Sequence, residues 1–158
     1  MGSPPLVLRE VPANAAEPTT LIAELDAEIS VRYPGPPMHG LHPGEHADRR
    51  LRFFLLEEGG VLIGCGALRE LESGIAELKR MFIRRPYRGR DLGRALLAEL
   101  EDKARTAGIR VMRLETGGLL TEAIALYHSA GYRVIPQYGE YIGDPISVCM
   151  EKRLSNKD

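Results

Sequence analysis

The segment from Arg84 to Arg94 carries the residues best suited to chemistry, because it combines five arginines with two glycines just before an amphipathic stretch. Arginine guanidinium groups donate charge-assisted hydrogen bonds to phosphates. A helix beginning here would expose unpaired backbone N–H groups, and its N-terminus would carry about half a positive charge. Gly89 and Gly93 let the backbone approach a ligand closely. The segment therefore predicts an anion site, suited to a pyrophosphate.

The alternative interpretation of the segment Arg84–Arg94 is a solvated basic turn that caps a surface helix. Two other phosphate-loop patterns do not occur in the chain, Gly-x-x-x-x-Gly-Lys-Ser/Thr and Gly-x-Gly-x-x-Gly. Gly64-Cys65-Gly66 lies inside an expected strand and leads to no helix, so it predicts a β-bulge. A binder of nucleotide phosphates stays open as a less favoured alternative.

A second group of chemically capable residues contains His39, His42 and His46, which fall within eight residues. Such spacing can bind zinc, and Glu45 and Asp48 lie close by in the sequence. Glycines and prolines separate these side chains, and no cysteine joins them. A polar loop is therefore favoured, and no metal site is expected.

The composition of the whole chain narrows the classes of partner. Its 158 residues suit one domain over residues 1–158, and a formal net charge of −1 argues against a generic nucleic-acid binder. Cys65 and Cys149 have neither metal-site nor disulfide-framework spacing, so a reducing cytoplasm is expected. No apolar run approaches the roughly 18 residues of a membrane span, and the N-terminus lacks a signal-peptide pattern. We expect a cytoplasmic protein without nucleic-acid or membrane partners.

Hydrophobic periodicity and turn residues predict the elements that position these groups. Strands are expected over Leu6–Val11, Arg52–Glu58, Val61–Glu70, Ile75–Arg84, Val111–Thr116, Arg133–Pro136 and Ser147–Lys152. Helices are expected around Leu21, Ile22, Leu25 and Ile29 with Thr19 or Thr20 as N-cap, around Glu45–Arg50, over Leu92–Thr106 and over Thr121–Ala130. Gly59-Gly60 predicts a hairpin turn, and Gly108 predicts a helix C-cap. This order predicts an α/β (mixed α+β) fold with helices on both faces of a mixed sheet.

Against this background, Arg88-x-x-Asp91-x-Gly93 resembles the acyl-CoA loop of the GNAT family of N-acetyltransferases, Arg/Gln-x-x-Gly-x-Gly/Ala. The segment 77–83 resembles that family's fourth strand, and the segments 115–117, 122–127 and 131–132 resemble its second cofactor region. The resemblance covers nearly the whole chain. It implies a mostly antiparallel sheet of about seven strands and acetyl-CoA as the acyl donor.

The resemblance also implies which residues bind acetyl-CoA. They are Met81, Phe82, Ile83, Arg88, Gly89, Arg90, Asp91, Leu92, Gly93, Arg94, Thr116 and Glu122. The backbone of Met81–Ile83 is implied to pair with the pantetheine arm and to polarise the thioester carbonyl. Asp91 departs from the pattern, because the family usually has Gly there. An Asp is a good helix N-cap, but its negative charge lies near the expected pyrophosphate.

Acetyl transfer requires a neutral amine, whereas a lysine-like amine is neutral only about once in 2,500 molecules at pH 7. Glu77 is the candidate general base, acting through water; the alternative is a carboxylate paired with Lys79 or an arginine. Tyr127 is implied to be the general acid that protonates the coenzyme thiolate. Its alternative role is core packing beside Ile124 and Ala130.

The acceptor is expected to be a primary amine, on a small molecule or a peptide. Tyr138 and Tyr141 flank a Gly-rich loop that could line its pocket, whereas Tyr132 is expected to pack after Gly131 and His128 to face solvent. The histidine loop could cover the acceptor, with Glu45 recognising a cationic amine. A non-catalytic acyl-CoA sensor is the main alternative function, and a monomer or homodimer is expected.

Overall fold

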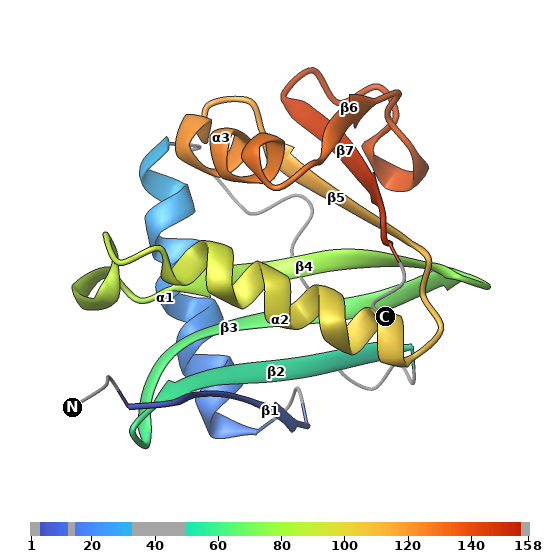
Figure 1. Ribbon diagram of the computed structural model, residues 1–158. Coiled ribbons are helices and arrows are strands. Elements are labelled where there is room, and N and C mark those ends of the chain that lie inside the picture. The colour runs from blue at the N-terminus through green and yellow to red at the C-terminus, as the bar shows by residue number, and fades with distance from the viewer. Residues whose placement is uncertain (1–3, 13–14, 33–49, 156–158) are drawn as a thin grey trace.

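The structure is a computed structural model that describes residues 4–12, 15–32 and 50–155 (Figure 1). Its strands are β1 (Leu6–Val11), β2 (Leu51–Glu58), β3 (Val61–Glu72), β4 (Ile75–Ile83), β5 (Val111–Gly117), β6 (Arg133–Ile135) and β7 (Ser147–Arg153). Its helices are α1 (Ala16–Arg32), α2 (Leu92–Thr106) and α3 (Thr121–Ser129), with short 3-10 turns at η2 (Arg85–Tyr87) and η3 (Gly139–Tyr141). The histidine cluster, Glu45 and nearly all of the short helix expected around Glu45–Arg50 lie outside the described residues.

The strands form one seven-stranded sheet in the order β1-β2-β3-β4-β5-β7-β6. Only the β4–β5 pair is parallel, and all the other pairs are antiparallel. Gly59 and Gly60 both have positive φ at the β2–β3 hairpin, the conformation that favours glycine in such turns. The mixed, mostly antiparallel sheet of seven strands is therefore confirmed.

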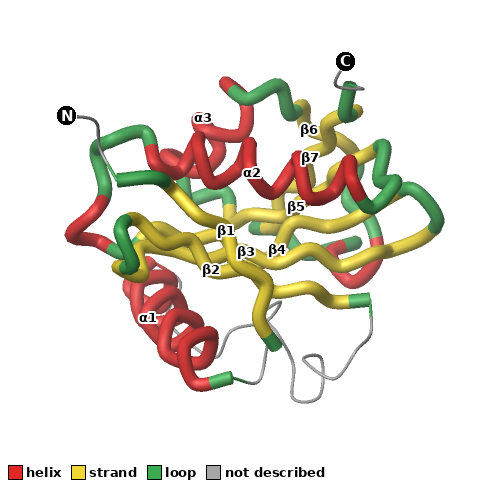
Figure 2. Tube along the Cα trace, turned by 60° about the horizontal axis from the view of Figure 1, so that its bottom comes forward, coloured by secondary structure: helices red, strands yellow, loops and turns green. Residues whose placement is uncertain are grey.

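The helices cover opposite faces of the sheet, as Figure 2 shows. On one face, Leu21 of α1 packs with a buried cluster that includes Phe53, Cys65 and Phe82. On the other face, α2 and α3 pack on a larger core, and Leu96 and Leu100 of α2 are fully buried there. Helices on both faces were predicted, and because side chains alternate along a strand, neighbouring residues of β4 face different helices.

The predicted start of the first helix is wrong. Helix α1 begins at Ala16, before either expected cap, and the Thr19 hydroxyl donates a hydrogen bond to the Ala15 carbonyl oxygen at 3.0 Å. The Thr20 hydroxyl bonds the Ala16 oxygen in the same way at 3.1 Å. Both threonines therefore satisfy carbonyls one turn back, an arrangement that the sequence pattern did not distinguish from an N-cap.

Helices α2 and α3 both end in a left-handed glycine, as expected from Gly108 and Gly131. After α3, the Tyr132 amide bonds the Tyr127 carbonyl oxygen at 3.0 Å, and the Gly131 amide bonds that of His128 at 3.1 Å. This closure brings the rings of Tyr127 and Tyr132 to a centroid distance of 5.9 Å, edge to face. Tyr132 packs after Gly131, and His128 is exposed, as predicted.

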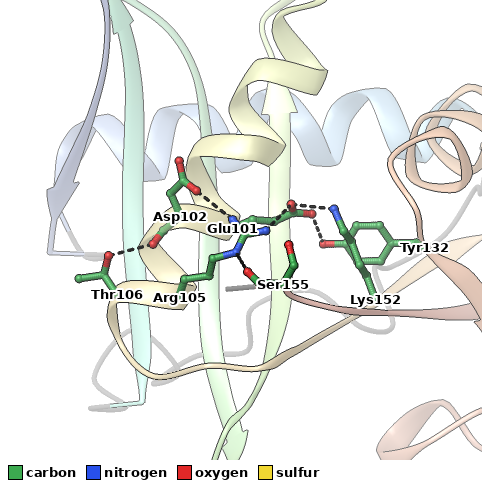
Figure 3. A network of polar contacts seen from close by, with 7 residues as sticks. All are labelled: Glu101, Asp102, Arg105, Thr106, Tyr132, Lys152 and Ser155. Atoms are coloured by element: carbon green, nitrogen blue, oxygen red, sulfur yellow. Dashed lines mark hydrogen bonds and ion pairs between the residues drawn. The ribbon is translucent and has the colours of Figure 1, made fainter. Parts of the chain in front are cut away.

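A polar network fastens α2 to the C-terminal strands on this face (Figure 3). The buried Glu101 carboxylate accepts hydrogen bonds from the Tyr132 hydroxyl and from Lys152 Nζ, both at 2.9 Å. Arg105 bonds Asp102 at 2.9 Å and the Ser155 carbonyl oxygen at 2.6 Å. The Tyr132 hydroxyl thus has a structural partner of its own, Glu101.

Candidate active site

Strands β4 and β5 separate just before Met81–Ile83, the segment that the family resemblance implied would pair with the pantetheine arm. Their parallel pairing runs from Ile75 opposite Val111 to Leu78 opposite Leu114, and then ends. In Figure 1 the two strands lie together at one end and diverge toward the end where α2 begins. The β4 edge from Lys79 to Ile83 therefore has no strand partner on its β5 side among the described residues.

A β-bulge in β4 coincides with this divergence. Arg80 has φ 56°, a left-handed conformation that non-glycine residues seldom adopt, and the β3–β4 register shifts between Cys65 and Ala67. The Arg80 guanidinium is held by an ion pair to Asp26 of α1. Gly64-Cys65-Gly66 was predicted to mark a bulge, and the register shift does lie there, but the extra residue belongs to β4.

The two glycines of that motif lie in closely packed surroundings, with a backbone atom next to Gly64 and a leucine side chain next to Gly66. A Cβ on Gly64 would lie 2.5 Å from the Phe82 carbonyl oxygen, and one on Gly66 would lie 2.6 Å from Leu100 Cδ1. Both distances are far below ordinary van der Waals contact. The glycines therefore let the bulged strand and helix α2 approach β3.

The turn after β4 presents backbone donors at the start of α2. The amides of Leu92, Gly93 and Arg94 precede the first intrahelical bond, from the Ala95 amide to the Asp91 oxygen, and no described residue accepts from them. No acidic residue lies in the first turn of α2. These donors and the helix dipole fit a phosphate group.

Asp91 occupies the N-cap position of α2, but the expected capping interaction is wrong. Its side chain makes no capping hydrogen bond, and its backbone is left-handed, with φ 57°. Asp tolerates this conformation better than most residues, and Gly adopts it without strain. The backbone geometry supplies a physical reason for a glycine at this position.

The arginines of the segment, expected as phosphate donors, are engaged with acidic residues of α1 and β2. The pairs and their N–O distances are Arg84–Glu24 at 3.0 Å, Arg85–Glu28 at 3.1 Å, Arg88–Glu28 at 2.7 Å and Arg90–Glu58 at 2.7 Å. Arg94 donates to the Ser129 hydroxyl at 2.7 Å. Each guanidinium carries five N–H donors, so these pairs orient the arginines without using all of their donors.

Glu77 lies in a buried polar cluster on the α1 face of the sheet. It is 3% exposed, and its Oε2 accepts hydrogen bonds from the Tyr138 hydroxyl at 2.5 Å and the Tyr141 hydroxyl at 3.0 Å. Lys79 Nζ lies 3.7 Å from its Oε1, so the predicted alternative pairing with Lys79 is present. The link to the tyrosines was not predicted.

Burial and the neighbouring charge of Glu77 raise the pKa of both Tyr138 and Tyr141 above the usual tyrosine value. The two rings meet edge to face at 5.3 Å, and the Arg113 guanidinium lies over the Tyr138 ring at 5.4 Å. Both hydroxyls are therefore held protonated as donors to the carboxylate.

Tyr127 projects from α3 on the opposite face of the sheet from Glu77. It is 8% exposed within the α2–α3 core, so the predicted packing role is present. Burial raises the pKa of Tyr127 to about 12, which keeps its hydroxyl protonated at neutral pH. Protonation is a requirement for a general acid.

The other residues implied to bind acetyl-CoA are spread around the divergence. Thr116 is buried near the end of β5, and Glu122 is exposed in the first turn of α3. Met81 is partly buried against the α2–α3 core, and Phe82 lies in the α1-side cluster. Met81 and Phe82 thus belong to the segment of β4 that lacks a strand partner, and their side chains lie on opposite faces of the sheet.

This chain matches a known family over most of its length. The sequence model described as the acetyltransferase (GNAT) family matches residues 19–132. The chain belongs to this family. It is similar to the IAA acetyltransferase of Azospirillum brasilense, with 39% identity over 94% of this chain and 97% of that protein.

Solved GNAT structures have the same architecture. A candidate acyl-CoA N-acyltransferase from Klebsiella pneumoniae superposes with a TM-score of 0.79 and 36% identity, over 95% of this chain and 98% of that one. A GNAT acetyltransferase from Elizabethkingia anophelis, solved with acetyl-CoA bound, has a TM-score of 0.70 and 17% identity, covering 94% and 98% of the two chains. The second likeness concerns the fold alone.

Membership of the GNAT family makes this chain an N-acetyltransferase by class.

In the described ranges, no group of three or more His, Cys, Asp or Glu side chains is arranged to hold a metal ion. Over the same ranges, no helix is long and apolar enough to cross a bilayer.

Proposed function

We propose that this GNAT protein transfers an acetyl group from acetyl-CoA to a primary amine, on a small molecule or a peptide. One observation carries the proposal: two groups suited to proton transfer lie on opposite faces of the sheet, and one of them, Glu77, lies just before the β4–β5 divergence. Glu77 lies on the α1 side and Tyr127 on the α2–α3 side. An amine could thus lose its proton on one side while the leaving group gains one on the other.

In this proposal, acetyl-CoA supplies the acetyl group as an activated thioester. The amides of Leu92, Gly93 and Arg94 bind its pyrophosphate, and the edge of Met81–Ile83 that lacks a β5 partner hydrogen-bonds the pantetheine arm. These contacts hold the reacting carbon at the divergence, where a fixed amine gains from proximity and orientation.

Glu77 receives the amine proton through a tyrosine hydroxyl. Its carboxylate is buried and accepts from both tyrosines, so direct contact with a bulky amine is hindered. Tyr138 is only partly buried, and its hydroxyl can accept the amine proton while passing its own to Glu77. The raised pKa of Tyr138 favours such a concerted transfer, because no free tyrosinate need form.

The alternative is a non-catalytic acyl-CoA sensor, favoured by the contacts that Glu77 already makes with Tyr138, Tyr141 and Lys79. Release of coenzyme A thiol from acetyl-CoA, measured against a panel of primary amines with mass detection of products, separates the two. We expect an amine-dependent release that falls about 10²–10⁴-fold in Glu77→Gln, the usual range for a general base. Tight acetyl-CoA binding with no acetylated product from any amine would favour the sensor.

A further inference from the structure

Lys79 carries a buried ammonium group whose hydrogen-bonding capacity is unused. Its side chain is 5% exposed, and Nζ makes no hydrogen bond with any residue that the structure describes. Glu77 Oε1 lies 3.7 Å from Nζ, an ion pair too long for a hydrogen bond, and the hydroxyls of Tyr138 and Tyr141 donate to Oε2. An ammonium has three donors, and leaving them unpaired in a buried place is costly. The site therefore lacks an acceptor group.

The position of Lys79 indicates which molecule would supply the missing hydrogen-bond acceptor. Lys79 is the first β4 residue beyond the last β4–β5 pair, at the apex of the divergence. It shares the α1 face with Glu77, two residues earlier on the same strand. An amine that reaches the Tyr138–Glu77 pair would therefore bring its own substituents close to Lys79.

The charge around Glu77 favours an anionic substituent. Arg69 on β3 and Arg113 on β5 are the Cα partners of Glu77, so two further cationic residues share the sheet face of Glu77 and Lys79. Two tyrosine hydroxyls already stabilise the negative charge of Glu77. A second carboxylate next to Lys79 would accept hydrogen bonds from the ammonium group. It would not compete for the tyrosine hydroxyls, which already donate to Glu77.

We propose that Lys79 binds a carboxylate of the acceptor, so that the substrate class is amino acids with amine and carboxylate only a few bonds apart. This inference rests on the proposed acetyl transfer. The short spacing follows from the strand, because residues two apart on one face lie about 7 Å apart along it. The groups that handle the amine and the carboxylate are therefore close neighbours.

The test uses acceptors in matched pairs, each amino acid with its carboxamide. For the wild type, we expect kcat/KM to favour the acid by at least about tenfold, the value of one net charged hydrogen bond. Lys79→Met, similar in length but uncharged, should remove this preference, chiefly through KM for the acid. Lys79→Arg should keep part of it, and Lys152→Met, which removes a lysine on the other face, should keep all of it.

Calorimetric titration of the amino acids into the protein with coenzyme A present gives a readout independent of turnover. Binding to the wild type that weakens at least about tenfold in Lys79→Met would support the inference. Lys79→Gln replaces Lys79→Met if the latter fails to fold. Equal use of acids and carboxamides by the wild type, or an unchanged ratio in the uncharged variants, would overturn it. If no amine is acetylated but Lys79-dependent carboxylate binding persists, the proposed function fails and the carboxylate site stands.

Discussion

Tyr127 combines a structural and a proposed chemical role in one side chain. It packs against Tyr132 at the end of α3, and its hydroxyl stays protonated because burial raises its pKa to about 12. Phenylalanine fills nearly the same volume and lacks only the proton. The two roles can therefore be separated by a single substitution.

Tyr127→Phe is expected to lower kcat about 10²–10⁴-fold, the usual contribution of a general acid, while KM for acetyl-CoA stays nearly constant. The matched control is Tyr132→Phe, which loses the hydrogen bond to Glu101 and should reduce stability by about 1–3 kcal/mol rather than turnover. Steady-state kinetics and urea unfolding of both variants provide the measurement. Full turnover in Tyr127→Phe would remove Tyr127 from the mechanism.

Asp91 affects the proposed pyrophosphate site through its charge and its backbone. Asp91→Gly is expected to bind acetyl-CoA roughly three- to tenfold more tightly, because it removes a nearby negative charge and a left-handed non-glycine residue. Asp91→Asn removes the charge and keeps a residue that tolerates positive φ, so it isolates the electrostatic part. Isothermal titration with acetyl-CoA measures both variants, and equal or weaker binding by Asp91→Gly would contradict the prediction.

At the scale of elements, the site depends on how closely β3 approaches the bulged β4. Gly64 makes that approach possible, because any Cβ there would meet the Phe82 backbone oxygen at 2.5 Å and Ile83 Cδ1 at 2.9 Å. The backbone of β4 must move to relieve such a clash. The movement would reach the strand edge proposed to bind the pantetheine arm.

Gly64→Ala is therefore expected to destabilise the protein by about 1–3 kcal/mol and to weaken acetyl-CoA binding. Gly118→Ala is the matched control, since its Cβ would lie 3.6 Å from the nearest heavy atom, the Ile146 oxygen, and should change stability by less than about 0.5 kcal/mol. Urea unfolding and acetyl-CoA titration compare the two. Similar stabilities would mean that β4 accommodates the added methyl group.

Predictions for the ends of helices and strands succeeded where the local sequence fixes the backbone conformation, and failed elsewhere. Glycines with positive φ follow α2 and α3, and a pair of them forms the β2–β3 turn, because these conformations depend on few neighbouring residues. The start of α1 was wrong because Thr19 and Thr20 bond carbonyls one turn back, which their sequence does not distinguish from capping. Asp91 failed as a cap because its backbone is left-handed there.

For the whole molecule, buried tyrosines couple stability to alkaline pH. Burial raises the pKa of Tyr127 to about 12 and, together with nearby carboxylates, raises those of Tyr132, Tyr138 and Tyr141. In the unfolded chain these hydroxyls ionise near pH 10. The contribution of Tyr127 to stability is therefore complete below about pH 10 and is lost as pH rises toward about 12, and the other three tyrosines act in the same direction.

The free energy of urea unfolding is expected to fall steeply above about pH 10, by up to about 1.4 kcal/mol per pH unit for each of these tyrosines. Tyr127→Phe should make the fall of the unfolding free energy with pH less steep, because it removes the contribution of one tyrosine. Urea titrations at several values between about pH 9 and pH 11.5 provide the measurement. A flat profile over this range would show that the tyrosines ionise as readily in the folded protein as in the unfolded chain.

The sequence by itself determined the order of the described strands and helices, the family resemblance and the turn for which anion binding is proposed. These features reside in hydrophobic periodicity, in glycine turns and in the contiguous segment Arg88–Arg94, and each depends on residues close together in the chain. The comparisons with known proteins then confirmed the family.

Only the tertiary structure decided which side chains of the candidate site contact one another. Tyr138 and Tyr141 reach Glu77 from 61 and 64 residues away, and the arginine segment pairs with acids of α1 and β2. The unused donors of Lys79 likewise appear only when the sheet buries it. Such contacts join residues distant in sequence, and folding of the whole sheet creates them, so no local pattern could predict them.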